Sequence, residues 1–193
     1  EEEEYPDGTW HLSDMQEVSA AVGYGPLRKD RNIHNGTINI NGTTYSKGLG
    51  APAASQIASD IAGLGLKKFQ AVAGIQQGQT NGSCEFLVYV DDILLHKTPI
   101  LTATTPETLD LDIPAGAKTL RIETITGGDV GNSDHSIWAD SKVVLEGKTQ
   151  NDLYILAVEM HEYVLAAAAD TATITLPGKL VSGDDADLSA AEI

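Results

Sequence analysis

Short runs of alternating apolar and polar residues recur up to Glu146, and Gly, Asn and Asp separate them. Such alternation is typical of strands with one buried face, and the intervening residues favour tight turns. The pattern predicts strands at Met15–Gly23, Ile38–Ile40, Ser55–Ile61, Phe69–Ile75, Glu85–Val90, Ile93–Lys97, Thr108–Ile113, Thr119–Ile125 and Ile137–Glu146. Many short strands joined by frequent turns indicate an all-β fold, a jelly-roll-like antiparallel β-sandwich.

Two turns and two continuous apolar runs refine this prediction. Asp91-Asp92 separates two apolar runs and predicts a hairpin, and Asn41-Gly42 predicts a second turn. Ile93–Leu95 and Val143–Leu145 are apolar at consecutive positions, which predicts strands buried on both faces inside stacked sheets.

The character of the chain changes after Gly147. Leu153–Leu165 is densely apolar and runs into Ala166–Ala169, a pattern that fits a helix or a strand. Thr171–Leu176 alternates cleanly and predicts a strand, and the acidic, Ala-rich end from Ser182 predicts a tail. We therefore expect an N-terminal extension (1–11), a β-sandwich (12–147) and a C-terminal extension (148–193). The last is too short to build its own core, so it packs on the sandwich or on another subunit, or belongs to a fragment of a longer protein.

The charge balance excludes some partners. The chain has 28 acidic and 12 basic residues, a formal net charge of −16. A nucleic-acid partner requires a basic patch that neutralises phosphates, and an anionic membrane surface has the same requirement. No apolar run is long enough to span a bilayer, so no membrane insertion is expected. Cys84 is the only cysteine, which rules out an intrachain disulfide and suggests a small core residue.

The sequence does not favour an enzyme. Asp91 and Asp92 are neighbours on a strand and diverge, whereas Asp110 and Asp112 share a face that reads as solvated. No nucleophile elbow or phosphate loop is present. The histidines are scattered without metal-ligand spacing at His11, His34, His96, His135 and His161.

Candidate binding residues gather in two segments, Gly23–Asp30 and Ser133–Asp140. Together they combine charge, a switchable imidazole donor and flat aromatic faces, a mixture suited to sugar rings with an apolar face and a polar rim. The candidate carbohydrate-binding residues are Tyr24, Asp30, Asp134, His135 and Trp138. Two alternatives stay open: Trp138 is a core residue with a satisfied N–H, and Asp134 with His135 ties the preceding loop to the sheet.

Oxygen-bearing side chains also suggest a metal site and glycosylation. Asp30, Asn32 and Asn35, with Asp134, could supply ligands to a structural calcium ion, although no fixed-spacing calcium motif is present. Asp30 could instead orient Arg31 or Lys29. Acceptor sequons for N-glycosylation begin at Asn35, Asn41 and Asn81, and each is also an Asn-Gly turn signal.

Several motifs in order resemble one known family. They are Leu12–Met15, Tyr24–Pro26 with Lys29-Asp30, Asn41–Gly50, Phe69 with Ala71–Gly74, and Ser133–His135 with Trp138-Ala139. The chain resembles the NPCBM-type carbohydrate-binding modules, family 51. The resemblance implies a β-sandwich, binding of galactose and related glycans, a place beside glycoside hydrolase domains, and a structural calcium ion.

The chain departs from the family pattern at three places. Gly50-Ala51-Pro52-Ala53 has no His where the family has a His-Ala pair. Gly74-Ile75-Gln76-Gln77 has amides where the family has adjacent acids, and Tyr24 replaces the leading Trp. These changes remove an imidazole and two carboxylates from a potential polar pocket.

The predicted function is therefore a non-catalytic, extracellular or cell-surface module that binds galactose-type glycans. The alternative is a structural subunit of a glycosylated surface assembly or filament, in which residues 150–180 contact copies of the same chain. A third interpretation is a piece of a large glycoside hydrolase.

Overall fold

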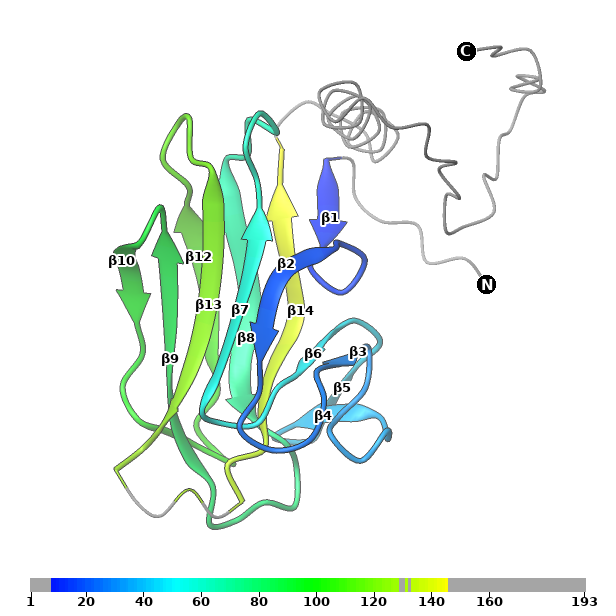
Figure 1. Cartoon of the computed structure of the whole chain (residues 1–193). Helices are drawn as coiled ribbons and strands as arrows, with labels where there is room; N and C mark the ends of the chain where they lie inside the picture. Colours follow the sequence, from blue (N-terminus) through cyan, green and yellow to red (C-terminus); the bar gives the residue numbers. More distant parts are fainter. Residues whose placement is uncertain (1–7, 129–130, 132, 146–193) are drawn as a thin grey trace, which may run out of the picture. The chain divides into compact units, whose positions relative to one another are not determined.

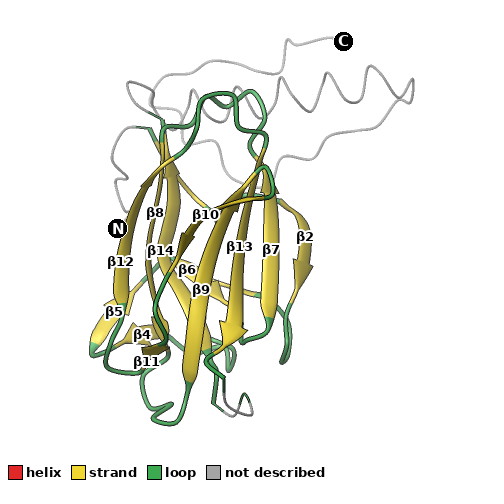
Figure 2. Cartoon of the chain, turned by 90° about the vertical axis from the view of Figure 1, so that its left-hand side faces the viewer, coloured by secondary structure: helices red, strands yellow, loops and turns green. Residues whose placement is uncertain are grey.

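The computed structural model describes residues 8–128, 131 and 133–145, and strands are the regular elements of this part (Figures 1 and 2). The first six-stranded sheet has the order β12 (Glu107–Asp112), β8 (Lys68–Ile75), β14 (Ser136–Val144), β6 (Gly48–Gly50) and β3 (Arg28–Lys29), with β1 (Thr9–His11) beside β14. The second has the order β10 (Ile93–Lys97), β9 (Ser83–Val90), β13 (Thr119–Thr126), β7 (Ser55–Asp60) and β2 (Glu17–Ala21), with β11 (Leu101–Thr102) beside β9. A hairpin of β4 (Ile38–Ile40) and β5 (Thr43–Tyr45) stands apart from both sheets.

All strand pairs are antiparallel, which confirms the predicted all-β sandwich. Each strand predicted up to Glu146 is present, with ends that differ by a few residues at most, whereas the strand predicted at Thr171–Leu176 lies outside the described residues. The short strands β1, β3, β5, β6 and β11 were not predicted, because two or three residues show little periodicity; β4, also three residues long, was predicted from its Ile-Asn-Ile alternation before the Asn41-Gly42 turn. Strand β1 lies in the segment assigned to an N-terminal extension, and there Trp10 pairs with Val143 of β14.

Trp138 is central to the core between the two sheets. Its indole is fully buried, at 0% exposure, and contacts the Phe86 ring of the opposite sheet edge-on at 5.0 Å between centroids. Its Nε1–H donates to the Thr124 hydroxyl oxygen at 3.1 Å, also across the sandwich. Trp138 is therefore a core residue whose N–H is hydrogen-bonded, as the alternative in the sequence analysis held. The stacking role considered for it is wrong, because a sugar cannot reach a buried ring.

The prediction that Ile93–Leu95 is buried on both faces is also wrong. Strand β10 is the edge of its sheet, and Ile93, Leu94 and Leu95 are 72%, 48% and 36% exposed. An apolar run does not reveal whether a second strand or a covering layer exists, and here β10 pairs with β9 alone. In the second run Val143 and Leu145 are buried, but Val144 between them is only partly buried, so this run too does not bury both faces fully.

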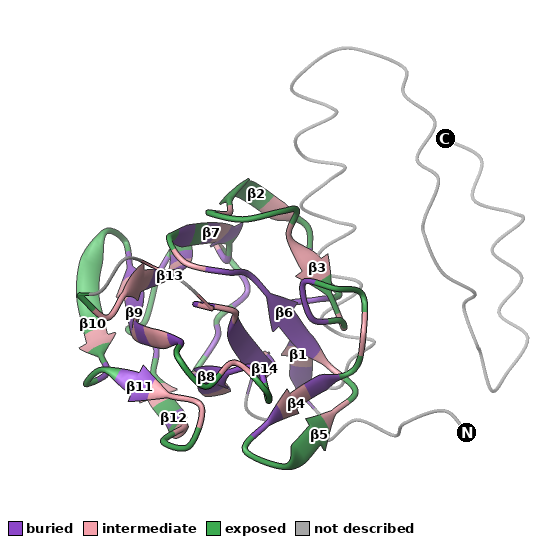
Figure 3. Ribbon diagram, turned by 90° about the horizontal axis from the view of Figure 1, so that it is seen from below, coloured by how far each residue is buried: buried purple, intermediate pink, exposed green. Residues whose placement is uncertain are grey.

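The loops that follow β2, β6, β8 and β13 gather at the lower end of the sandwich in Figure 1, and Figure 3 views this end directly. We call it the loop end. Because antiparallel strands return the chain to the same end, segments distant in sequence meet there. The predicted C-terminal extension lies outside the described residues. Within the described residues there is no helix long and apolar enough to cross a lipid bilayer.

Candidate functional site

A pocket of about 290 Å³ opens at the loop end. Its lining comes from three segments: Gly23-Tyr24 after β2, Pro52-Ala53 between β6 and β7, and Ser133–His135 with Gly131 before β14. The volume lies near the lower limit of the roughly 300–1,000 Å³ that is usual for small-molecule pockets. The pocket therefore suits one small ring better than a long chain.

Backbone contacts hold the three segments together. The Gly23 N–H donates to the Pro52 carbonyl at 3.2 Å, and the Ala53 N–H donates to the Asp134 carbonyl at 3.0 Å. A Cβ on residue 23 would lie 2.4 Å from the Ala53 carbonyl oxygen, a distance that only glycine avoids. The main chain thus fixes the pocket before any side chain contributes.

Tyr24 presents an aromatic face at the pocket. Its side chain is 61% exposed, and its ring stacks on the imidazole of His135 with centroids 6.2 Å apart and planes 15° from parallel. An exposed ring held in place by a second ring offers a flat apolar surface next to polar groups. Such a surface matches the C–H face of a pyranose ring.

The His135 imidazole is the polar group next to that surface. Its second ring neighbour is His34, with centroids 5.0 Å apart and planes tilted by 57°. Burial, and then the nearby charge of His34, lowers the pKa of His135 below its usual value. A neutral imidazole has one ring nitrogen that donates and one that accepts, so it can pair with a sugar hydroxyl in either sense.

Asp134 has a structural role in the same loop. Its side chain is buried, and Oδ1 accepts a hydrogen bond from the Ser83 N–H at 2.8 Å. The carboxylate thus ties the segment before β14 to the start of β9, as the second interpretation of this residue expected. Asp134 is also one of the residues that line the pocket.

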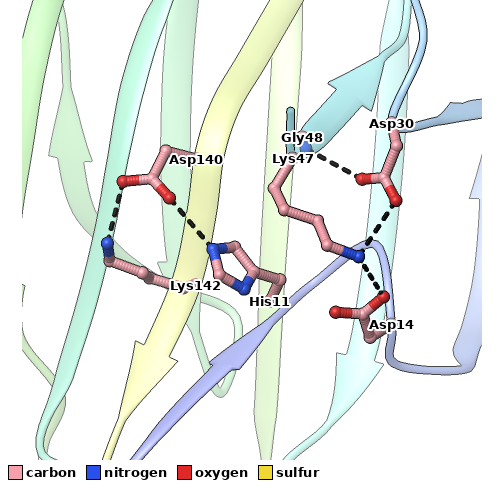
Figure 4. Close-up of polar contacts among 7 residues, drawn as sticks. All are labelled: His11, Asp14, Asp30, Lys47, Gly48, Asp140 and Lys142. Carbon is pink, nitrogen blue, oxygen red and sulfur yellow. Dashed lines mark hydrogen bonds and ion pairs between the residues drawn. The ribbon is translucent and has the colours of Figure 1, made fainter. Parts of the chain in front are cut away.

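Asp30 is not brought to the pocket. Its carboxylate accepts from Lys47 Nζ and from the Gly48 N–H, each at 3.1 Å, and Lys47 also binds Asp14 at 2.7 Å (Figure 4). Burial lowers the pKa of Lys47, but the hydrogen bonds and charges of Asp14 and Asp30 outweigh burial and raise the pKa above its usual value. Asp30 therefore belongs to an ion-pair cluster that joins the start of the chain to the loop before β6.

The predicted calcium ligands are engaged in local bonds. Asn32 Oδ1 accepts from the N–H groups of His34 and Gly36 at 3.0 and 2.9 Å, and its Nδ2 donates to the Thr37 carbonyl at 2.9 Å. Asn35 lies in the left-handed region with φ of 63°, which supports its turn role. No cluster of three or more His, Cys, Asp or Glu side chains suited to a metal ion occurs among the described residues. Calcium binding stays a prediction.

The sequon asparagines Asn35, Asn41 and Asn81 are all exposed, and their glycosylation also stays a prediction. Asn41 has a φ of 46° and forms the β4–β5 turn. Gln77, one of the amides in place of the family acids, accepts from the Gly42 N–H at 2.8 Å and holds this turn.

Sequence reasoning missed several pocket residues. Gly23, Pro52 and Ala53 line the pocket but carry no chemistry of their own. His34, which contacts the pocket residue His135 without lining the pocket, stood isolated in the sequence. The departure from the family pattern at 50–53 could have pointed to the site, since Pro52 and Ala53 line the pocket.

Comparison with known proteins adds the family. The model of the NPCBM/NEW2 domain matches residues 8–144. A family 51 carbohydrate-binding module from a Clostridium perfringens GH95 protein, solved in complex with methyl-galactose, shares 31% identity with a TM-score of 0.67, over 70% of this chain and 99% of that one. The CBM51-2 and INT domains of Clostridium perfringens ZmpB, solved with GlcNAc, share 27% identity with a TM-score of 0.66, over 80% and 35% of the two chains.

A curated relative from Renibacterium salmoninarum, named "Putative endo-alpha-N-acetylgalactosaminidase", is 33% identical over 149 residues. The alignment covers 71% of this chain but 10% of that protein. The likeness thus concerns one module of a much longer chain.

Proposed function

Because this chain belongs to the NPCBM/NEW2 family of carbohydrate-binding modules, we propose that its loop-end pocket binds a single galactose-type sugar residue. The observation that carries the proposal is the exposed Tyr24 ring, stacked on the His135 imidazole at the edge of a pocket of about 290 Å³. The sugar's apolar face packs on Tyr24, and its hydroxyls pair with His135 and with main-chain groups of the lining.

The choice of galactose rests on the module solved with methyl-galactose. That module is covered over 99% of its length and was solved with methyl-galactose, whereas the module solved with GlcNAc is somewhat less identical to this chain. A stacked ring with few charged partners also favours a neutral sugar over an acidic one. The described lining contains one carboxylate, Asp134, and no Lys or Arg.

Isothermal titration of the full chain with methyl-galactose, GlcNAc and glucose tests the proposal. We expect methyl-galactose to bind most tightly and Tyr24→Ala to weaken binding at least about tenfold. Tyr89→Ala is the matched control, since Tyr89 packs on the Arg121 guanidinium at 4.0 Å and neither residue lines the pocket. Wild-type affinity in Tyr24→Ala would reject this pocket as the site. Preference for GlcNAc would keep the site and reject the galactose assignment.

In this proposal the chain binds sugar outside the cell and has no catalytic activity. Its solved relatives are binding modules, and the long curated relative carries an enzyme name of which this chain matches a small part. Incubation with aryl α- and β-galactosides should release no phenol. The alternative of a surface-assembly subunit depends on residues 150–180, which lie outside the described residues, and it stays a prediction.

A further inference from the structure

The imidazole rings of His34 and His135 lie next to each other at the loop end, and the sugar proposal makes no use of this pair. His34 lies in the loop between β3 and β4, and His135 lies just before β14. Their ring centroids are 5.0 Å apart, and their planes are tilted by 57°. Two segments distant in the sequence thus bring two imidazole rings into one small region.

This separation fits two imidazoles that share one metal ion. A Zn–N bond of about 2.0–2.1 Å, plus roughly 1.1 Å from nitrogen to ring centre, puts each centroid about 3.2 Å from the ion. For a tetrahedral angle at the metal, the two centroids then lie about 5.2 Å apart. The observed 5.0 Å between the centroids is close to that value.

The environment of the pair agrees with metal binding. His34 is exposed and reachable from solvent, whereas Tyr24 stacks on His135 and limits its rotation. Among the described residues, Nδ1 of His135 is buried without a hydrogen-bond partner. Metal ligation requires the neutral imidazole, and burial, followed by the charge of His34, lowers the pKa of His135 and so favours that form.

We propose that His34 and His135 bind one late first-row divalent cation, such as Zn²⁺, Ni²⁺ or Cu²⁺, at the rim of the loop-end pocket. Imidazole suits these metals, whereas Ca²⁺ requires oxygen ligands. Two protein ligands leave the other coordination positions to water or to hydroxyls of a ligand in the pocket. This site is separate from the predicted calcium site and does not depend on sugar binding.

Isothermal titration of the full chain with ZnCl₂ alone, in a buffer containing excess Ca²⁺ to occupy exposed carboxylates, tests the proposal. We expect one Zn²⁺ per chain, and at least about a tenfold loss of affinity in His34→Ala. His34 is exposed, so this variant should fold normally. The matched controls are His96→Ala, which removes an imidazole paired with Glu107, and His161→Ala, which removes the histidine outside the described residues.

A second measurement identifies the ligands directly. Addition of Zn²⁺ should shift the imidazole NMR signals of His34 and His135 and leave those of His11 and His96 in place. No binding of Zn²⁺, Ni²⁺ or Cu²⁺, or wild-type affinity in His34→Ala, would overturn the proposal. Because the probe is the metal alone, failure here leaves the sugar proposal intact, and failure of sugar binding leaves this one intact.

Discussion

Gly23 passes so close to Ala53 that a Cβ on residue 23 would lie 2.4 Å from the Ala53 carbonyl oxygen and from the Ala54 nitrogen. Both contacts are main-chain atoms, so no side-chain rotation relieves them. The absence of a side chain at Gly23 therefore sets the position of the next residue, Tyr24, over His135.

Gly23→Ala should accordingly separate the two segments and move Tyr24 off His135. We expect a loss of about 1–3 kcal/mol in the free energy of unfolding, in the range of overpacked sites, together with loss of sugar binding. Urea unfolding and isothermal titration measure the two effects. Gly116→Ala is the control, because Gly116 has a φ of +79° with open space around it, so it adds backbone strain without a collision. Unchanged sugar affinity in Gly23→Ala would contradict the idea that the close approach of Gly23 to Ala53 positions Tyr24 for sugar binding.

Trp138 and Tyr24 should respond oppositely to truncation. Trp138→Ala removes a fully buried ring and is expected to cost about 3–5 kcal/mol of stability. Tyr24→Ala removes an exposed ring and should change the stability by no more than about 0.5 kcal/mol, while it weakens sugar binding. Thermal and urea unfolding of both variants check this. A large destabilisation by Tyr24→Ala would show that the ring is part of the structural core and not a binding face.

Asp140 should make stability depend on pH in the acid range. A hydrogen bond from His11 Nε2 at 2.9 Å, followed by one from Lys142 at 2.8 Å, lowers the pKa of Asp140 despite its partial burial (Figure 4). A carboxyl whose pKa is lower in the folded state contributes stability above its unfolded pKa, which is about 3.9. That contribution is lost as the pH falls from about 4 through the lower folded value.

Asp140→Asn should therefore lower stability at neutral pH and flatten its decline below pH 4, as chemical unfolding across a pH series would show. Asp112→Asn is the control, because its side chain is 89% exposed and pairs with Lys68 at the surface. An equal flattening in both variants would assign the acid dependence to general charge and not to Asp140. Side-chain exposure of 42% at Asp140 screens the interaction, so a modest effect is expected.

The exposed apolar edge at β10 should be dispensable for folding. Leu94→Lys places a charge on an edge strand, a substitution that discourages edge-to-edge pairing. We expect stability within about 0.5 kcal/mol of wild type and less light scattering at high protein concentration. Marked destabilisation of the monomer would show that Leu94 is covered by part of this chain in solution.

The sequence was sufficient for the long strands because their signal is local. In β8 and β13 buried and less buried positions alternate over most of the strand, and one face of each strand must be buried wherever the strand lies. The continuous apolar run of β10 lacked that information, and its exposure depends on which strands are its neighbours.

The candidate site was predictable only in part. Tyr24 and His135 were identified from their chemistry, and the structure stacks them on each other. Asp30 was grouped with them on the same grounds, yet it pairs with Lys47 instead. His34 gave no signal, because a lone histidine in a sequence does not show which imidazole lies next to it.

The amino-acid sequence by itself determined the fold class, the family and two aromatic candidates, Tyr24 and Trp138, since periodicity and ordered motifs are properties of neighbouring residues. The tertiary structure decided which of the two aromatic candidates is exposed. It buried Trp138 under Phe86 of the opposite sheet and left Tyr24 at the pocket. It also brought Pro52 and Ala53 to the wall of that pocket. The reason is that burial and site geometry depend on contacts between segments far apart in the chain, which antiparallel pairing of the whole sandwich creates.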